Sequence, residues 1–280
     1  MTDELTLKKQ KILLEMLFFF HRVCEENGLT YYALGGTLLG AARHSGFIPW
    51  DDDVDVGMPR SEYDRLRALA PSLSGEKYRF EFPDSPDPRF CYPFAKMYDT
   101  GTTLIENVRP RLVRGIYIDI FPLDGLCDEK KDVLRSYRPV WHQKTMLDLN
   151  RIKLKKERSL KNNLALIAAR MIPPYYHGAK RIALKIDAMC RKNAFESKKY
   201  VGNLVGAWGA RELVPREFFG KPVELDFENI KINCPADTDG YLTAIYGDWR
   251  TPPPPEKQIT HHDSETDLNT PYTQIGKAKK

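Results

Sequence analysis

The chain has 280 residues, a formal net charge of +5, and a composition that is 42% hydrophobic and 11% aromatic. These values exclude a disordered protein and favour one large globular domain, or one domain with an insertion, because such a chain can bury a large core. The five cysteines form no C-x-x-C pair, which argues against a disulfide framework or a zinc site and for reduced thiols, at positions 24, 91, 127, 190 and 234.

The first expected element is a helix over residues 5–27, because apolar residues recur there at helical spacing. The apolar run at residues 12–20 contains Glu15 and is far shorter than the roughly 20 residues that a membrane-spanning helix needs. No small-residue cleavage site follows it, so a core-packed helix is favoured over a signal peptide. We therefore expect a cytoplasmic chain.

A strand over residues 29–34 then leads into Gly35 and Gly36, and a short helix is expected to start at Thr37. At such a turn, exposed backbone N–H groups and the helix dipole can hold a phosphate group. A Gly-Gly pair alone is a weak signal, so this interpretation depends on the residues that come after it in the chain.

Those residues include an acidic cluster, Asp51, Asp52, Asp53 and Asp55, whose mutual repulsion is costly unless a cation lies among them. Asp53 and Asp55 alternate with valines, so on a strand both carboxylates project from one face, with Cα atoms roughly 6.5–7 Å apart. Both could then reach one divalent ion or bridge a pair of ions. Ligation by oxygen alone favours Mg²⁺ or Mn²⁺.

Two alternatives to a catalytic metal site remain for this cluster. A calcium-binding EF-hand loop would start at Asp51 and end at Glu62, but Val56 then occupies the position that requires glycine. A solvated acidic turn accounts for Asp51 and Asp52, but it explains poorly the alternation of acids with valines.

The next expected elements are a helix over residues 59–70, with Ser61 as its N-cap, and strands over residues 77–82, 91–98 and 114–125. Asp119 lies between two isoleucines on the last of these strands. An acid in that setting is costly unless it is paired or binds a metal, so Asp119 is a candidate for a third carboxylate in the site.

From residue 130 to residue 199 the chain holds 19 Lys or Arg against 5 Asp or Glu, a surplus of +14 that leaves −9 for the remainder. We expect a basic helical insertion over about residues 128–200, broken at Pro173 and Pro174, with an apolar stripe at Ile182, Ile186 and Met189. A solvated helical face and an anionic membrane surface are both compatible with this charge. Nucleic acid is a third possibility, but no nucleic-acid-binding motif supports it.

The last expected elements are strands over residues 222–227 and 230–233 and a helix over residues 237–246. A proline run follows, and the tail from about residue 263 to residue 280 is expected to be mobile.

The segment GGTLLGAARHSGFIPWDDDVDV, residues 35–56, resembles the signature of the LicD family, which includes phosphocholine transferases and relatives of fukutin-related protein. Three later segments match family-like sequences in the same order: KMYDTGTTL, IDIFPLDG and YGDWRTPPPPEKQITHH. The resemblance implies one nucleotidyltransferase-like domain over residues 1–280. Its fold would be α/β (α+β), a mixed sheet core with flanking helices and the basic helical insertion.

The resemblance also implies an activity, the transfer of phosphocholine from CDP-choline to a sugar hydroxyl, with release of CMP. The acceptor would be a cell-surface glycan such as lipopolysaccharide or teichoic acid, or a lipid-linked precursor, which could be polyprenyl-linked. Asp53 and Asp55 would hold the metal ions, Mg²⁺ or Mn²⁺. Asp119 would complete the site and help to deprotonate the attacking hydroxyl.

Carried onto this sequence, the family scheme has Gly35, Gly36 and Thr37 binding the diphosphate oxygens. Arg43 or Lys96 would neutralise the leaving phosphate, although a surface lysine on a strand is an equal interpretation of Lys96.

The choline group would meet aromatic rings, with Trp50 and either Tyr92 or Tyr117 forming a box around the quaternary ammonium. Asp51 and Asp52 would meet the choline charge or simply orient the loop. Core packing is the alternative for the aromatic residues.

His261 and His262 follow the proline run and would approach the acceptor, or belong to a disordered tail. Two rival functions use the same residues. The first is a nucleotidyltransferase that attacks a nucleoside triphosphate, and the second is a glycan-binding or membrane-binding module without activity. The expected partners are CDP-choline, a sugar acceptor and, at the inner face of the cell membrane, anionic lipid, with no nucleic acid.

Overall fold

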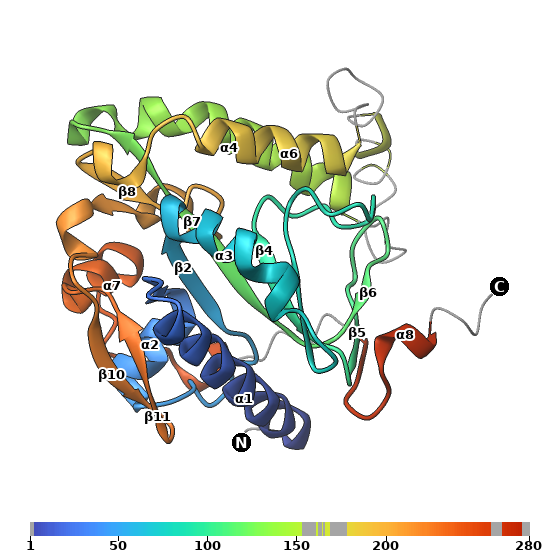
Figure 1. The fold of residues 1–280 in the computed structure, drawn as a ribbon. Helices are drawn as coiled ribbons and strands as arrows, with labels where there is room; N and C mark the ends of the chain where they lie inside the picture. Colours follow the sequence, from blue (N-terminus) through green and yellow to red (C-terminus); the bar gives the residue numbers. More distant parts are fainter. Residues whose placement is uncertain are drawn as a thin grey trace.

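The computed structural model describes residues 3–152, 161, 164, 166–168, 178–258 and 265–275. Its centre is a seven-stranded mixed sheet in the order β1-β2-β7-β4-β3, with β8 and β9 extending from the far half of β7 (Figure 1). The strands of this sheet are β1 (Tyr32–Ala33), β2 (Asp55–Pro59), β3 (Tyr78–Glu81), β4 (Ala95–Asp99), β7 (Tyr117–Cys127), β8 (Tyr200–Gly202) and β9 (Leu213–Pro215). The predicted mixed α+β fold is confirmed.

One parallel pair, β2 and β7, lies at the middle of the sheet, and every other strand pair in it is antiparallel. The register places Asp55 of β2 opposite Asp119 of β7, and Asp119 opposite Lys96 of β4. Because successive side chains point to opposite faces of a strand, these polar residues leave the sheet on one face and their apolar neighbours on the other.

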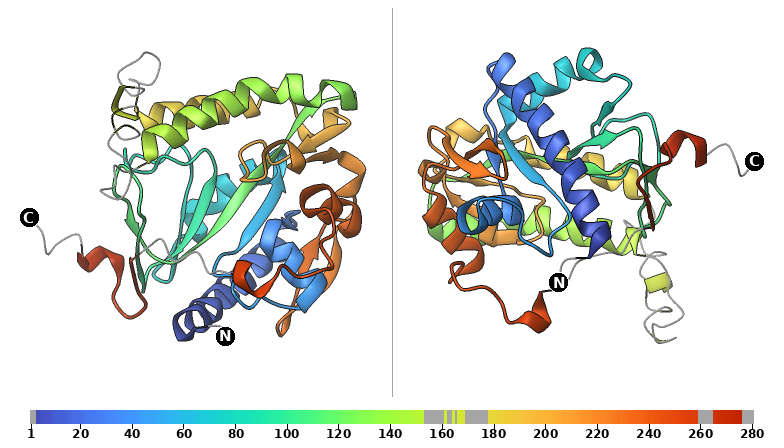
Figure 2. Two further views of the ribbon diagram at one scale, coloured as in Figure 1. Left: turned by 180° about the vertical axis from the view of Figure 1, so that it is seen from behind. Right: turned by 90° about the horizontal axis from the view of Figure 1, so that it is seen from below.

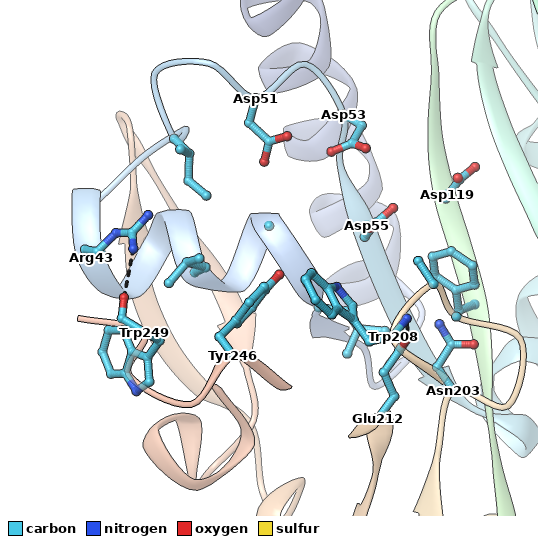
Figure 3. Close-up of a pocket in the computed structure, with 18 of the residues that line it drawn as sticks. Arg43, Asp51, Asp53, Asp55, Asp119, Asn203, Trp208, Glu212, Tyr246 and Trp249 are labelled. Carbon is cyan, nitrogen blue, oxygen red and sulfur yellow. Dashed lines mark hydrogen bonds between the residues drawn. The ribbon is translucent and has the colours of Figure 1, made fainter. Parts of the chain in front are cut away.

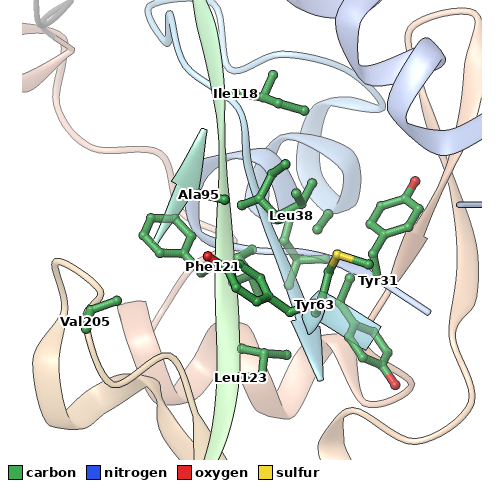
Figure 4. Close-up of a cluster of buried hydrophobic side chains, with 14 of the residues drawn as sticks. Tyr31, Leu38, Tyr63, Ala95, Ile118, Phe121, Leu123 and Val205 are labelled. Carbon is green, nitrogen blue, oxygen red and sulfur yellow. The ribbon is translucent and has the colours of Figure 1, made fainter. Parts of the chain in front are cut away.

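Two helices, α1 (Glu4–Glu26) and α3 (Arg60–Leu73), pack against the apolar face of the sheet (Figure 1). Asp3 caps α1 by accepting a 2.8 Å hydrogen bond from the backbone N–H of Thr6. The core between these layers is tightly buried; Ile118 and Ile120 of β7 and Tyr63 of α3 are each 0% exposed (Figure 4). All five cysteines are free and buried, in agreement with the predicted reduced thiols.

The other face of the sheet is bordered by α2 (Gly35–His44), α7 (Thr238–Tyr246) and the hairpin β10 (Val223–Phe227) and β11 (Ile230–Cys234). Figure 2 shows this face from behind, where α1 and α3 no longer cover it. A cleft lined by Asp55 of β2 and Asp119 of β7 lies on this face.

The basic segment forms two long antiparallel helices between β7 and β8, α4 (Val133–Arg151) and α6 (Ala179–Cys190), which pack side by side (Figure 1). The predicted stripe faces inward, with Ile182 and Ile186 buried and Met189 half-buried. Arg60 of α3 ties α6 to the core through ion pairs of 2.6 Å with Asp124 and 2.9 Å with Asp187. The predicted break at residues 173–174 lies outside the described residues.

The remaining elements are short. They are strands β5 (Thr103–Ile105), β6 (Val113–Arg114) and β12 (Glu265–Asp267), helix α8 (Tyr272–Ile275), and 3-10 turns at Lys130–Asp132, Phe195–Ser197, Gly209–Glu212, Arg216–Phe218 and Pro255–Lys257. Within the described ranges, no helix is both long enough and apolar enough to cross a bilayer.

Several element boundaries differ from the predictions. The strand expected over residues 29–34 is only β1, and α2 begins at Gly35 rather than at Thr37. The N-cap of α3 is Pro59, so the prediction of Ser61 as N-cap is wrong; Ser61 lies inside the first turn and donates a 3.0 Å hydrogen bond to Glu196. Boundaries of this kind depend on tertiary contacts that a local sequence pattern does not contain.

Part of the tail expected to be mobile from residue 263 is instead a strand, β12, which pairs antiparallel with β5. The tail is anchored further when Thr103 donates a 2.7 Å hydrogen bond to the carbonyl of Thr270 and Tyr272 donates one of 3.0 Å to the carbonyl of Thr102. Within residues 265–275 the tail is thus paired with a distant strand, and its mobility stays a prediction.

Candidate active site

A cleft of about 770 Å³ opens on the face of the sheet opposite α1 and α3. Its walls are the start of α2, the acidic loop, the N-terminal ends of β2 and β7, the loop at residues 203–208, and the segment from residue 246 to residue 257. Ten of its residues are labelled in Figure 3. The cleft therefore brings together segments that lie far apart in the sequence.

Three of the predicted acids, Asp53, Asp55 and Asp119, line this cleft (Figure 3). The strand begins at Asp55, two residues later than expected, yet Val54 and Val56 are both buried as the alternation predicted. Asp53 therefore extends from the loop that precedes β2, and Asp55 and Asp119 face each other across the parallel pair.

The backbone around Asp55 is fixed by hydrogen bonds on both sides. Its N–H donates to the hydroxyl of Thr37 over 2.9 Å, and its carbonyl accepts from the N–H of Leu34 over 3.0 Å. Thr37 is 3% exposed and is not among the residues that line the cleft. Its hydroxyl thus positions Asp55 and does not face the space where a diphosphate would lie.

The buried acids of the cleft repel one another when they are ionised. Burial, and then the carboxylates of Asp53, Asp119 and Asp51, raise the pKa of Asp55 well above its usual range. Burial and the carboxylate of Asp53 also raise the pKa of Asp51 to about 9. An added cation would relieve both effects, because an opposite charge favours the ionised form of a carboxyl group.

Lys96 is buried behind Asp119, with 1% of its side chain exposed, and its ammonium lies 2.6 Å from the Asp119 carboxylate. The ring centroids of Tyr117 and Tyr92 lie 3.3 and 4.3 Å from the same nitrogen. Burial lowers the pKa of Lys96 and raises that of Asp119, although each partner's charge opposes its shift. Lys96, Tyr92 and Tyr117 are not among the lining residues, so they are placed to support Asp119 from behind.

The start of α2 and the acidic loop touch each other. A Cβ on Gly36 would overlap the carboxylate of Asp51, so only glycine lets this loop approach the helix so closely. Gly35 and Gly36 line the cleft as the first residues of a helix whose N-cap makes no side-chain hydrogen bond. The N–H groups of this turn are therefore available to a ligand.

Asp52 points away from the cleft and pairs with Lys9 of α1 over 2.8 Å. Trp50 lines the cleft, as does Arg43, whose guanidinium also donates a 2.8 Å hydrogen bond to the carbonyl of Trp249. His261 and His262 lie outside the described residues, although the neighbouring Lys257 lines the cleft.

Sequence reasoning did not single out a second set of lining residues: Lys144, Asn203, Trp208, Glu212, Tyr246 and Trp249. The sequence carries one signal for Trp208, because Gly206 and Gly209 on either side of it indicate a loop. Tyr246 and Trp249 lie in a segment whose only signal in the sequence is its family resemblance. Lys144 comes from α4, so the basic insertion contributes to the cleft.

The donor set of the cleft fits a hard divalent cation, since its candidate ligands are carboxylate oxygens and neighbouring carboxylates raise the pKa of Asp55. Within the described part of the chain, no group of three His, Cys, Asp or Glu side chains is gathered around one point as a ready metal site.

Comparison with known proteins gives concordant results. Residues 28–155 match the family described as LicD/FKTN/FKRP, nucleotidyltransferase domain. The chain is 28% identical to lipopolysaccharide cholinephosphotransferase LicD of Haemophilus influenzae over 265 residues, which cover 94% of this chain and 98% of that protein.

Two further similarities cover shorter stretches. Human ribitol 5-phosphate transferase FKRP is 58% identical over 36 residues, 13% of this chain and 7% of that protein. Mannosyltransferase regulator 4 of Saccharomyces cerevisiae is 28% identical over 151 residues, 51% of this chain and 12% of that protein. These matches show that the chain is a transferase and that its residues 28–155 are similar to the nucleotidyltransferase domain of the LicD/FKTN/FKRP family.

Proposed function

We propose that this transferase moves phosphocholine from CDP-choline to a sugar hydroxyl of a cell-surface glycan or its lipid-linked precursor, and releases CMP. The observation that supports it most is the placement of Asp55 and Asp119 on adjacent parallel strands beside the open N-terminus of α2. This arrangement sets an anion-binding turn next to a cluster of carboxylates, as transfer of a phosphoryl group requires.

In the proposed reaction, the acceptor oxygen attacks the phosphorus that bears choline. The bond from this phosphorus to the bridging oxygen breaks, and its electron pair leaves with CMP. The hydroxyl proton passes to a carboxylate, which we assign to Asp119 because Lys96 holds it at the cleft wall. The backbone N–H groups of Gly35 and Gly36 would hold the diphosphate, and Arg43 and Lys144 would offset its charge.

Asp53 and Asp55 would hold the divalent cation, and Asp119 beside them would complete the site. When bound, Mg²⁺ or Mn²⁺ would neutralise charge on the phosphoryl oxygens and on the departing phosphate. Asp55 and Asp119 determine the position of the cation, since the strands that carry them, β2 and β7, are anchored in the core.

Release of CMP from CDP-choline, with Mg²⁺ and a mixture of bacterial glycans as acceptors, tests this function. Asp55→Asn should lower the rate by on the order of 100-fold or more, because the site loses charge that acts in the transition state. Asp226→Asn is the matched control, since its carboxylate lies on the exposed hairpin and pairs with Lys231. An unchanged rate in Asp55→Asn would place the reaction outside this cleft. Turnover of CTP or ATP with release of pyrophosphate, and none of CDP-choline, would favour the nucleotidyltransferase instead.

We also propose that the outer surface of α4 and α6 contacts an anionic membrane, where a lipid-linked acceptor would be presented. Three apolar side chains are exposed there, Leu134 by 70%, Trp141 by 53% and Leu184 by 39%. Basic residues alternate with them, at positions 135, 138, 181 and 185. Apolar anchors among basic side chains are typical of helices that lie in a membrane interface.

Sedimentation with lipid vesicles tests the membrane contact. We expect binding to phosphatidylglycerol vesicles that weakens as salt is added, because the attraction to anionic lipid is screened. Trp141→Ala should weaken this binding and leave CMP release in solution unchanged. Equal binding to neutral phosphatidylcholine vesicles, or none to either, would contradict the proposed surface.

A further inference from the structure

Trp208 is unusual among the residues of the cleft because its large aromatic side chain remains 43% exposed. Its ring packs edge-to-face on that of Tyr246, with centroids 4.8 Å apart and an interplanar angle of 74°. Tyr246 is half-buried in the same cleft. A tryptophan that remains 43% exposed inside a cleft offers a ligand both area and a π face.

The loop that carries Trp208 is anchored by hydrogen bonds to two buried side chains. The N–H of Trp208 donates a 2.9 Å hydrogen bond to Glu212, and that of Val205 donates one of 3.1 Å to Asn203. Glu212 and Asn203 are 4% and 2% exposed, so both anchors lie in the protein interior. A Cβ on Gly206 would overlap the Glu212 carboxylate, which shows how closely the loop packs on its anchor. The exposure of Trp208 is thus built into the fold.

The aromatic pair lies in the same cleft as the acids. The pKa of the Tyr246 hydroxyl is raised by burial and then by the carboxylates of Asp55, Asp51 and Glu212, so these acids lie within its reach. Figure 3 shows both rings below the row of carboxylates. A quaternary ammonium group gains from the π face of tryptophan, whereas a neutral polyol gains little from it.

We propose that Trp208, packed on Tyr246, forms a subsite for a quaternary ammonium group and thereby selects a choline-bearing donor over one with a neutral polyol. The inference deepens the proposed function and rests on it for the rest of the donor. It replaces the box predicted from Trp50 with Tyr92 or Tyr117, because the structure places both of those tyrosines around Lys96.

Calorimetric titration with four compounds, CDP-choline, CDP-ribitol, CMP and phosphocholine, tests the subsite in the presence of Mg²⁺. The wild type should bind CDP-choline about tenfold more tightly than CDP-ribitol, and Trp208→Ala should remove this preference. Affinity for CMP should stay unchanged in the variant. Trp208→Phe should restore part of the preference, because it keeps an aromatic face. Phe18→Ala is the matched control, as this aromatic side chain is 46% exposed on α1, outside the cleft.

The four ligands separate failure of the subsite from failure of the proposed function. If Trp208→Ala weakens CMP and CDP-choline equally, the ring contacts the nucleotide and the subsite is refuted. If the wild type ignores CDP-choline but binds phosphocholine, with that binding lost in Trp208→Ala, the subsite stands and the proposed donor is wrong. Binding of none of the four compounds by the wild type would refute both proposals.

Discussion

Replacing Lys96 by methionine gives the sharpest test of how the site is built. The ammonium lies 2.6 Å from Asp119, and the two side chains are 1% and 17% exposed. Removing one partner of a buried ion pair leaves an uncompensated charge, which typically costs about 3–5 kcal/mol. For a chain of this size we expect a fall in melting temperature on the order of 10 °C.

The loss should depend on pH. Without the ammonium, which opposes the effect of burial, the pKa of Asp119 in the folded state rises further above its unfolded value of about 3.8. The folded state then binds more protons than the unfolded state in the window between these two pKa values, so stability falls as the pH rises through it. The deficit of Lys96→Met, measured by urea unfolding, should therefore be smaller at pH 5 than at pH 8.

A double-mutant cycle decides whether the pair is the cause. Lys96→Met combined with Asp119→Asn should recover most of the lost stability, because no buried charge remains unpaired. If the two substitutions are additive, or if Lys96→Met costs less than about 1 kcal/mol as a solvated surface pair would, the account of a buried pair supporting Asp119 is wrong.

Three further predictions concern the start of α2 and the loop anchor. Gly36→Ala should lower kcat/KM by about 100-fold in the transfer assay, because its Cβ would displace the carboxylate of Asp51. Thr37→Val should lower the free energy of unfolding by about 1–3 kcal/mol, and also lower activity, because the backbone N–H of Asp55 loses its acceptor. Burial raises the pKa of Glu212 from 4.5 to about 7, so this acid binds more protons in the folded state and its contribution to stability falls between these pH values. In urea unfolding, Glu212→Gln should therefore gain stability relative to the wild type between pH 5 and pH 8.

Each of these three predictions has its own control. Gly75→Ala should leave activity unchanged, since a Cβ there meets nothing within 4 Å. Thr37→Ser keeps the hydroxyl and should retain most of the stability that Thr37→Val loses. A difference between Glu212→Gln and the wild type that does not vary with pH would show that this carboxyl does not titrate as described.

The sequence alone predicted the acids of the site because strand geometry is local. Alternation with valines predicted that Val54 and Val56 are buried and that the acids beside them face away from the core, and Asp119 between isoleucines follows the same rule, although Asp53 precedes the strand itself. The glycines before the acids likewise predicted the open start of α2, with an error of two residues in where the helix begins. Fold class and family resemblance followed from these short segments.

What the sequence could not provide is which segments meet. The sequence left Lys96 as either a phosphate-neutralising residue or a surface lysine on a strand. The register of β4 against β7 places it opposite Asp119, buried among tyrosines. Trp208 reaches the cleft because β8 returns to pair with β7, and Lys144 reaches it because α4 packs against β7. The sequence by itself determined the acids, their spacing and the strand faces that carry them. The tertiary structure alone decided their partners, because pairing between distant strands depends on the packing of the whole core and not on local periodicity.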